Sequence, residues 1–435
     1  MKCFVGIDLG STTTKAVILD ENCHIMGRGI TNSRSNYDVA CQVAKTEAYI
    51  DARFGLLKRN IKDANTKEAL FHALERAFRY EQYLEQSKRF IDELKALVGI
   101  ARYADDFDVL SDFLAWFEDQ NLAYGRALFL GDRSPKSDFF RDLVGSCYNQ
   151  KAADYSKQTQ CSFDMLLGLF DKSIIKVENQ SLELGFEANI RSAFHTVSTQ
   201  AEDPELFAAI EKVIAEELHE VCVVGTGYGR QRLPFPKEQI RSEILCHGLG
   251  AHFMFPNTRT VLDIGGQDTK AIQVDGKGIV TSFQMNDRCA AGCGRYLGYI
   301  AEEMNLALQE LGPLANSAAK AIKINSTCTV FAGAELRDRL SDGQKREEIL
   351  LGLHRAIIYR ALSLLARSGG INDEFTFTGG VAKNEAALNS LKELVWENYG
   401  REITINVAPD SIFTGAIGAA IFALREVNAH VVGAA

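Results

Sequence analysis

Two short segments of this 435-residue chain place an aspartate at the end of an apolar run and follow it with a glycine turn. The first contains Asp8 and Gly10, and the second contains Asp263 and Gly265. A glycine turn lets backbone N–H groups come close to oxygen atoms. A carboxylate repels phosphate, so it would act through Mg²⁺, directly or through water. Each segment is therefore expected to bind nucleotide phosphates, although a single hairpin of this kind could equally be an ordinary tight turn.

The two segments repeat one another, which favours the phosphate interpretation. Residues 6–17 align without gaps on residues 261–272, and Asp, Gly, Thr and Lys recur in step. Each copy reads as an apolar strand, a tight turn and a second apolar strand. Two facing hairpins would hold the phosphates from both sides. The residues predicted to contact the nucleotide from the two hairpins are Gly10, Ser11, Thr12, Thr13, Lys15, Gly265 and Gly266.

A third segment, residues 375–384, reads as a buried strand, a Gly379-Gly380 turn and the start of a helix that includes Lys383 and Asn384. The turn would let the backbone lie flat against a ligand, and a helix N-terminus favours anions. In this order the three segments resemble the two phosphate motifs and the adenosine motif of the actin/sugar-kinase/Hsp70 superfamily. Residues 408–420 resemble its closing helix, in which small residues allow close packing.

This resemblance implies an α/β fold of two ribonuclease-H-like lobes that close over MgATP, with water attacking the γ-phosphate. By the same resemblance, Asp8 and Asp263 position Mg²⁺ and the attacking water, and Gln267 and Asp268 are secondary candidates. Catalysis of this kind consists of positioning and charge stabilisation.

The cysteines offer a second kind of chemistry. Of the ten, Cys289 and Cys328 each precede a helical pattern, and a helix N-terminus stabilises thiolates and anionic clusters. An iron–sulfur cluster usually needs four cysteines, so two from this chain would require two from another. A zinc site is the alternative, although its spacing differs from paired Cys-x-x-Cys. Its candidate ligands are Cys246, His247, Cys289, Cys293 and Cys328.

Residues 286–292 and 326–332 resemble the cluster motifs of the ATP-dependent activators of 2-hydroxyacyl-CoA dehydratases and of the related ATPase subunits of benzoyl-CoA reductase. The resemblance implies that Cys289 and Cys328 bind a [4Fe–4S] cluster shared with a second, similar chain. The position of Cys293 is commonly Thr in the activators, so Cys293 is left out of the ligand set. Residues 225–230, 243–247 and 263–268 also resemble this family.

The chain changes character twice along its length. Residues 38–200 are mostly helical in pattern, whereas strand and helix alternate before and after them. We therefore expect the N-terminal lobe to begin at 1–37, a helical insertion that could dock other subunits at 38–200, the rest of the N-terminal lobe at 201–258, and the C-terminal lobe at 259–435. The family resemblance covers residues 1–35 and about 220–425.

The insertion makes the chain resemble the larger ATPase subunit of benzoyl-CoA reductase. That resemblance implies that ATP hydrolysis drives low-potential electrons from reduced ferredoxin through the cluster to the ring-reducing subunits. The partners would be a smaller homologous ATPase subunit and two catalytic, substrate-binding subunits. The alternatives are a homodimeric activator of a 2-hydroxyacyl-CoA dehydratase, a small-molecule kinase such as an amino-sugar kinase, and a chaperone-like ATPase without redox chemistry.

The composition disfavours two further classes of function, nucleic-acid binding and membrane insertion. The net charge of -9 disfavours nucleic-acid binding, because no basic excess exists to neutralise phosphates. No apolar run reaches the length of a membrane span, and the sequence enters a strand near residue 2 without a signal-peptide pattern. We therefore expect a cytoplasmic protein without a membrane partner, whose thiols stay reduced.

Overall fold

The computed structural model describes the chain except at certain positions, and at some others it describes the backbone alone. The undescribed residues are 34–35, 62–66, 132–134, 136, 138, 160, 180–184, 228–232, 234, 287–291, 325–328, 401 and 434–435. Backbone alone is described at 101, 329–330, 332 and 429–433. The described chain divides into two compact units. One comprises residues 2–33 and 219–435, and the other comprises residues 34–218 with Met1.

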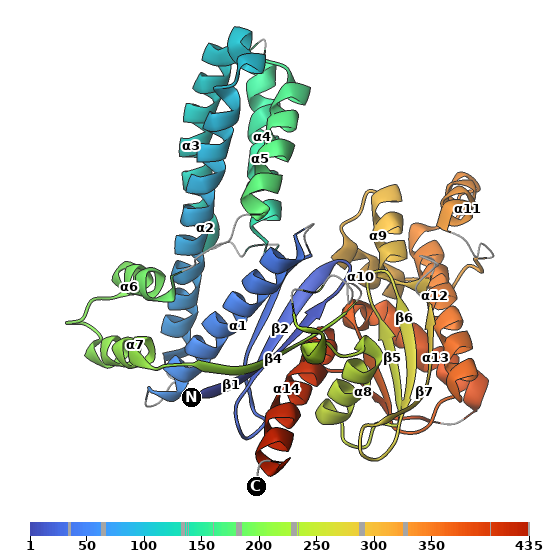
Figure 1. Cartoon of the computed structure of the whole chain (residues 1–435). Helices are drawn as coiled ribbons and strands as arrows, with labels where there is room; N and C mark the ends of the chain where they lie inside the picture. The colour runs from blue at the N-terminus through green and yellow to red at the C-terminus, as the bar shows by residue number, and fades with distance from the viewer. Residues whose placement is uncertain are drawn as a thin grey trace. The chain divides into compact units, whose positions relative to one another are not determined.

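The first unit contains two sheets of related topology (Figure 1). In the first sheet, β1 (Lys2–Leu9), β2 (Thr13–Leu19) and β3 (Ile25–Asn32) are antiparallel neighbours, and β4 (His219–Gly227) runs parallel to β1. In the second sheet, β5 (Thr260–Ile264), β6 (Thr269–Val274) and β7 (Val280–Asn286) repeat that pattern, and β8 (Phe375–Thr378) runs parallel to β5. β9 (Ile405–Asn406) extends the second sheet beyond β8. The sequence repeat therefore corresponds to a repeated hairpin with the same neighbours.

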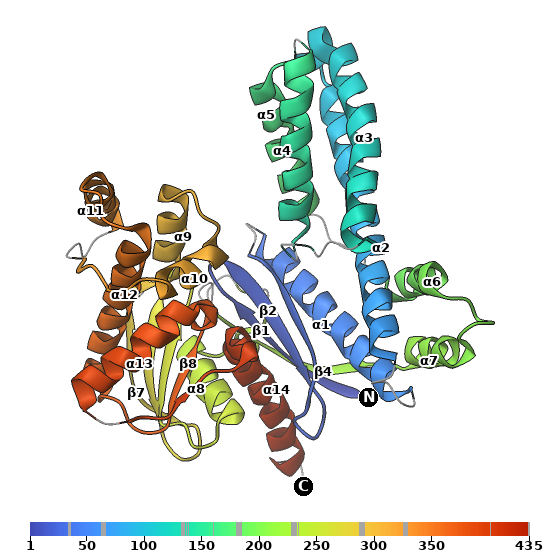
Figure 2. The ribbon, with the colours of Figure 1, turned by 180° about the vertical axis from the view of Figure 1, so that it is seen from behind.

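Two helices lie between these sheets (Figure 2). α14 (Thr414–Gly433) packs on β1, β2 and β4, and α8 (Glu243–Met254) contacts α14 and also β6 and β7. Small residues make this packing possible. A Cβ on Gly6 would lie 2.1 Å from the Ala416 carbonyl oxygen, and one on Gly418 would lie 1.9 Å from that of Cys246. At these two glycines the backbone of α14 is in direct contact with the backbones of β1 and α8.

The packing of α14 differs from the division expected from the sequence. Residues 259–435 were expected to form the C-terminal lobe, but α14 covers the first sheet and shares a core with Phe4 and Val17. The reason is steric, because Gly6 on β1 accepts only a helix with small residues, and α14 supplies Ala416 and Ala420.

Helices around the second sheet complete the first unit. They are α9 (Gly294–Glu303), α10 (Leu311–Asn316), α11 (Thr329–Ser341), α12 (Arg346–Ser368) and α13 (Glu385–Tyr399). All five bury a residue in one core with β5 and β8, namely Tyr296, Leu311, Leu336, Leu353 and Leu391. In the described part of the chain, one helix is long and apolar enough to cross a membrane: α12, whose apolar window is 61% buried within the protein. Its burial is that of a core helix.

The second unit is helical. Its helices are α1 (Tyr37–Arg59), α2 (Glu68–Val98), α3 (Phe107–Phe129), α4 (Phe140–Gln158), α5 (Phe163–Glu178), α6 (Phe186–Val197) and α7 (Pro204–Ala215). Four of these, α2 to α5, share an aromatic core in which Phe90, Phe113, Phe117 and Tyr148 are fully buried. Edge-to-face ring pairs stabilise such cores beyond their buried area, and Phe117 and Tyr148 lie 4.9 Å apart, centroid to centroid.

Helix α7 was expected in the N-terminal lobe but belongs to the helical unit. It contacts α1 and α6, and the Arg53 guanidinium of α1 donates to the Val213 carbonyl oxygen near its end. Asp203 caps its N-terminus by accepting from the Leu206 N–H at 3.1 Å, and Pro204 begins the helix. The caps fix where the helix starts, and its apolar face then packs on its helical neighbours.

Candidate nucleotide site

The first hairpin holds Asp8 opposite Lys15. The two residues are paired across β1 and β2, and Lys15 Nζ lies 3.8 Å from Asp8 Oδ2. Asp8 is 5% exposed. Ser33 at the end of β3 secures the turn, since its hydroxyl donates to the Gly10 carbonyl oxygen and lies 3.0 Å from Thr14 Oγ1. Among the described residues, Asp8 has one ion pair, and that pair is long.

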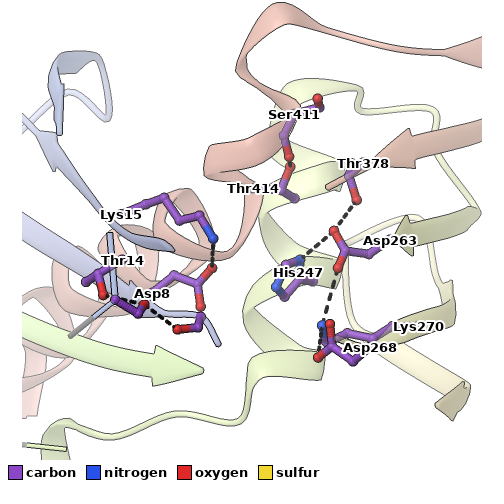
Figure 3. Close-up of polar contacts among 12 residues, drawn as sticks. Asp8, Thr14, Lys15, His247, Asp263, Asp268, Lys270, Thr378, Ser411 and Thr414 are labelled. Carbon is purple, nitrogen blue, oxygen red and sulfur yellow. Dashed lines mark hydrogen bonds and ion pairs between the residues drawn. The ribbon is translucent and has the colours of Figure 1, made fainter. Parts of the chain in front are cut away.

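The second hairpin holds its aspartate much more tightly (Figure 3). Asp263 lies opposite Lys270 across β5 and β6, and Lys270 Nζ lies 3.3 Å from Asp263 Oδ2 and 2.7 Å from Asp268 Oδ2. The Thr378 hydroxyl of β8 donates to Asp263 Oδ1 at 2.8 Å. His247 Nδ1 of α8 lies 3.3 Å from the same oxygen. Asp263 is therefore engaged by residues from three other elements.

The charges in this network determine its protonation. Burial would raise the pKa of Asp263, but the His247 and Lys270 charges outweigh it and hold that pKa far below its usual range. Burial would lower the pKa of Lys270, but Asp263 and Asp268 raise it instead. Burial likewise opposes the His247 charge, yet Asp263 raises the pKa of His247 above its ordinary value. These shifts favour the charged forms of Asp263 and Lys270.

Helix α8 also brings an acidic residue, Glu243, to the site. Glu243 lies one turn before His247, and burial raises its pKa, partly opposed by the Lys270 charge. Gly415, at the start of α14, leaves room for the site. A Cβ there would lie 2.9 Å from Asp8 Oδ2 and 2.9 Å from His247 Nε2. Since both atoms lie within 2.9 Å of one point, they are less than 6 Å apart. His247 thus stands between the aspartates of the two hairpins.

The turns of the two hairpins meet. A Cβ on Gly266 would lie 2.3 Å from Thr12 Oγ1 and 3.7 Å from Ser11 Oγ, so glycine is required for this approach. Ser11 and Thr13 are half-buried, Thr12 is exposed and Gln267 is half-exposed in its turn. Of the residues predicted from the two turns, the structure brings Ser11 and Thr12 of the first next to Gly266 of the second. Hydroxyls on one side and a glycine backbone on the other are groups that can bind phosphate oxygens.

The predicted adenosine motif lies beside the second hairpin. Gly379 has a φ of 85°, and a Cβ there would lie 2.3 Å from the Ile264 carbonyl oxygen, so the turn demands glycine. Space is open around Gly380, and the Lys383 side chain is exposed. Asn384 serves the fold, because its Oδ1 accepts from the Ala387 N–H at 3.1 Å and caps α13. The Asn384 amide nitrogen also lies 3.0 Å from His354 Nε2.

A hydrogen-bonded joint connects the second hairpin to the segment that contains Cys289. The Gly294 N–H donates to the Gly265 carbonyl oxygen at 2.8 Å, and the Arg295 N–H donates to that of Gly266 at 2.7 Å. The Thr269 hydroxyl donates to the Gly292 carbonyl oxygen. These three hydrogen bonds attach the turn of the second hairpin to the start of α9.

The two predicted cluster ligands, Cys289 and Cys328, lie outside the described residues. The helices that follow them are described. α11 begins at Thr329, immediately after Cys328, and α9 and α11 contact each other. A Cβ on Gly333 would lie 2.4 Å from the Tyr299 hydroxyl oxygen, so glycine allows this contact. Both helices lie at one end of the second sheet (Figure 1).

The zinc alternative finds no support among the described residues. Cys246 and Cys293 are fully buried, and no group of three or more His, Cys, Asp or Glu that could hold a metal occurs in the part of the chain that the structure describes. Burial raises the pKa of Cys246 to about 12. A protonated, buried thiol is a poor metal ligand.

Three residues of the site went unpredicted: His247 as a site residue, Thr378 and Lys270. The sequence repeat could have identified Lys270, because it aligns with Lys15. The i,i+4 spacing of Glu243 and His247 places them on one face of α8, but nothing in the sequence indicates that this face meets Asp263. Thr378 is one of several threonines at strand ends, and only the parallel pairing of β5 with β8 brings it to Asp263.

Known proteins share much of this sequence. Residues 5–423 match the model of the BadF/BadG/BcrA/BcrD ATPase family. The (R)-2-hydroxyglutaryl-CoA dehydratase activating ATPase of Acidaminococcus fermentans is 40% identical over 203 residues, which are 47% of this chain and 75% of that protein. One of the subunits of benzoyl-CoA reductase from Thauera aromatica is 35% identical over 176 residues, 40% of this chain and 62% of that protein.

Among solved structures, the activator of 2-hydroxyisocaproyl-CoA dehydratase from Clostridium difficile with bound ADPNP is similar in fold. Its TM-score is 0.54 at 21% identity, covering 99% of this chain and 97% of that one. The predicted fold class, the duplicated actin-like α/β ATPase, is thereby confirmed.

Proposed function

This chain belongs to the BadF/BadG/BcrA/BcrD ATPase family, and we propose that it couples ATP hydrolysis to electron delivery, as an activator of a 2-hydroxyacyl-CoA dehydratase. The observation that carries the proposal is the 40% identity to a dehydratase-activating ATPase, which spans 75% of that protein. This function takes the place of the benzoyl-CoA reductase subunit that the insertion suggested. The electron acceptor would be a separate dehydratase, reached transiently.

We assign different roles to the aspartates of the two hairpins, Asp8 and Asp263. Asp8 is the carboxylate with a single long ion pair, so it is the residue we assign to holding Mg²⁺ and the attacking water. Asp263 is already engaged by Lys270, His247 and Thr378, so its role is to fix the position of His247 and of the second phosphate turn. Mg²⁺ would supply charge neutralisation at the phosphates. Gln267 and Asp268 remain candidates beside it.

The redox half of the proposal depends on Cys289 and Cys328. A [4Fe–4S] cluster held by them and by two cysteines of a second, similar chain would supply the low-potential electron, with ferredoxin as the donor. The described residues fit this idea in one respect. The joint between Gly266 and Arg295 connects the phosphate turn to the segment carrying Cys289, which gives ATP a direct way to act on the cluster's surroundings.

A second candidate function is the ATPase subunit of a benzoyl-CoA reductase, favoured by the 35% identity to the Thauera aromatica protein. That function would require a smaller homologous ATPase subunit and two catalytic subunits in one stable complex. Purification distinguishes the two functions. An activator is expected as a brown homodimer, whereas a reductase subunit is expected in a four-subunit complex.

The test of the proposal is anaerobic purification followed by iron and sulfide analysis and an electron-transfer assay. The homodimer should contain one four-iron cluster and should, with ATP and reduced ferredoxin, activate a 2-hydroxyacyl-CoA dehydratase. With an ATP analogue that cannot be hydrolysed, activation should fail. A colourless, iron-free protein with ordinary ATPase turnover would refute the redox function and leave a kinase or a plain ATPase.

A further inference from the structure

The helical unit contains a groove of about 860 Å³ between α2, α3 and the end of α6. Figure 1 and Figure 2 both show α2 and α3 side by side, with α6 beside the lower half of α2. The described residues that line it are Ala69, His72, Ala73, Arg76, Ala123, Arg126, Ala127, Phe129, Leu130, Gly131, Thr196 and Val197. None of these belongs to the nucleotide site.

The two long helices present matching stripes to this groove. On α2 the stripe is Ala69, His72, Ala73 and Arg76, spaced i, i+3, i+4 and i+7. On α3 the stripe beginning at Ala123 has the same spacing, with Arg126 in the place of His72. Each stripe thus carries two alanines one turn apart and a basic residue between them, His72 on α2 and Arg126 on α3. Alanines on both walls leave space for another backbone, and this spacing is that of one helix face.

The groove is positively charged in an acidic chain. Three lining residues, His72, Arg76 and Arg126, are basic and no described lining residue is acidic, although the chain carries a net charge of -9. Arg76 is fixed in place, because its guanidinium donates to the carbonyl oxygens of Leu128 and Gly131 at 3.2 and 2.5 Å. His72 and Arg126 are exposed and can meet an incoming carboxylate.

We propose that this groove binds an acidic amphipathic α-helix of a partner protein. A helix with carboxylates at i and i+3 or i+4 would place them opposite the two cationic stripes while its small apolar residues lie on the alanines, which is the helix-in-groove mode of recognition. Electrostatic complementarity of this kind sets the orientation and the rate of association. A nucleic acid is a poorer match, because the rest of the chain repels phosphates.

The experiment uses the full-length protein and two labelled alanine-based peptides of about 18 residues, long enough for five turns. One carries glutamates at i, i+4 spacing and the other carries glutamines at the same positions. Fluorescence anisotropy should show that the glutamate peptide binds at least about tenfold more tightly, and that binding weakens as salt rises from about 50 to about 300 mM. Equal binding of the two peptides would overturn the proposal.

Three variants locate the binding. Arg126→Glu should weaken glutamate-peptide binding by about tenfold or more, and Ala127→Trp should do the same by filling the groove. Lys88→Glu, an exposed residue elsewhere on α2, is the matched control and should bind as the wild type does. Circular dichroism and ATP hydrolysis should be unchanged in all three. Wild-type affinity in both groove variants, or tighter binding of a single-stranded DNA of similar charge, would overturn the proposal.

Discussion

Lys270 and Asp263 lie directly opposite each other on β5 and β6, with Nζ 3.3 Å from Oδ2, in the register that Lys15 and Asp8 share on β1 and β2. The duplicated residues have nevertheless taken different roles. Lys270 Nζ also lies 2.7 Å from Asp268, whereas Lys15 stands 3.8 Å from Asp8. In the second hairpin, Asp263 belongs to a buried network of ion pairs. In the first hairpin, Asp8 has one long ion pair and can still bind a ligand.

This asymmetry predicts different costs for removing the two lysines. Lys270→Met should destabilise the protein by about 3–5 kcal/mol, because two buried carboxylates lose their cation. Lys15→Met should cost clearly less, since it breaks one long pair. Urea unfolding at neutral pH measures both. The deficit of Lys270→Met should shrink on acidification, since an Asp263 without its cation can take up a proton. Equal losses for the two variants would contradict the asymmetry.

Part of this arrangement could be predicted from the sequence and part could not. The repeat of residues 6–17 in residues 261–272 identified both hairpins, and the paired glycines marked the turn at Gly379, because glycine at a close approach leaves a readable pattern. The role of His247 depends on how α8 fits between two sheets, and no local pattern records it. The placement of α14 on the first sheet follows from contacts over hundreds of residues, such as Gly6 with Ala416.

His247 should impose a pH dependence on stability. Its pKa is raised above the ordinary 6.5, burial being outweighed by Asp263. Its protonated form therefore stabilises the fold fully below about pH 6.5, and this contribution is lost as pH rises through the raised pKa. The wild-type melting temperature should fall over that interval relative to His247→Gln. His252→Gln is the control, because burial lowers the pKa of His252 and the imidazole is already neutral there. If the melting temperatures of the wild type and of His247→Gln change with pH in parallel, the prediction is wrong.

Thr269 should be needed to transmit the nucleotide state to the segment carrying Cys289. Thr269→Val keeps the shape of the side chain but leaves the Gly292 carbonyl oxygen without the hydroxyl that donates to it. The free energy of unfolding should fall by about 1–3 kcal/mol. Hydrogen exchange of residues 287–293 should change on adding nucleotide in the wild type and change much less in Thr269→Val. Thr269→Ser retains the hydroxyl and should restore the response. If valine and serine respond alike, the joint does not act through Thr269.

Asp8 should be required for hydrolysis and dispensable for folding. Asp8→Asn keeps the side-chain volume and removes the charge proposed to hold Mg²⁺, so turnover should fall by about two orders of magnitude or more. Nucleotide binding, followed with a fluorescent analogue, should persist with reduced dependence on Mg²⁺. Asp275→Asn, in the exposed turn between β6 and β7, is the matched control and should turn over normally. Normal hydrolysis by Asp8→Asn would transfer the role to another carboxylate.

The cysteines separate the redox function from the ATPase. Cys289→Ser and Cys328→Ser should each lose iron, because a four-iron cluster shared by two chains has no spare ligand. Both variants should still hydrolyse some ATP, since neither cysteine belongs to the phosphate turns. Cys293→Ser is the informative comparison. Cys293 is fully buried at the start of α9, so serine there should lower stability and leave the iron content unchanged. If Cys293→Ser loses iron while Cys289→Ser keeps it, the ligand is Cys293 and the resemblance has assigned the wrong residue.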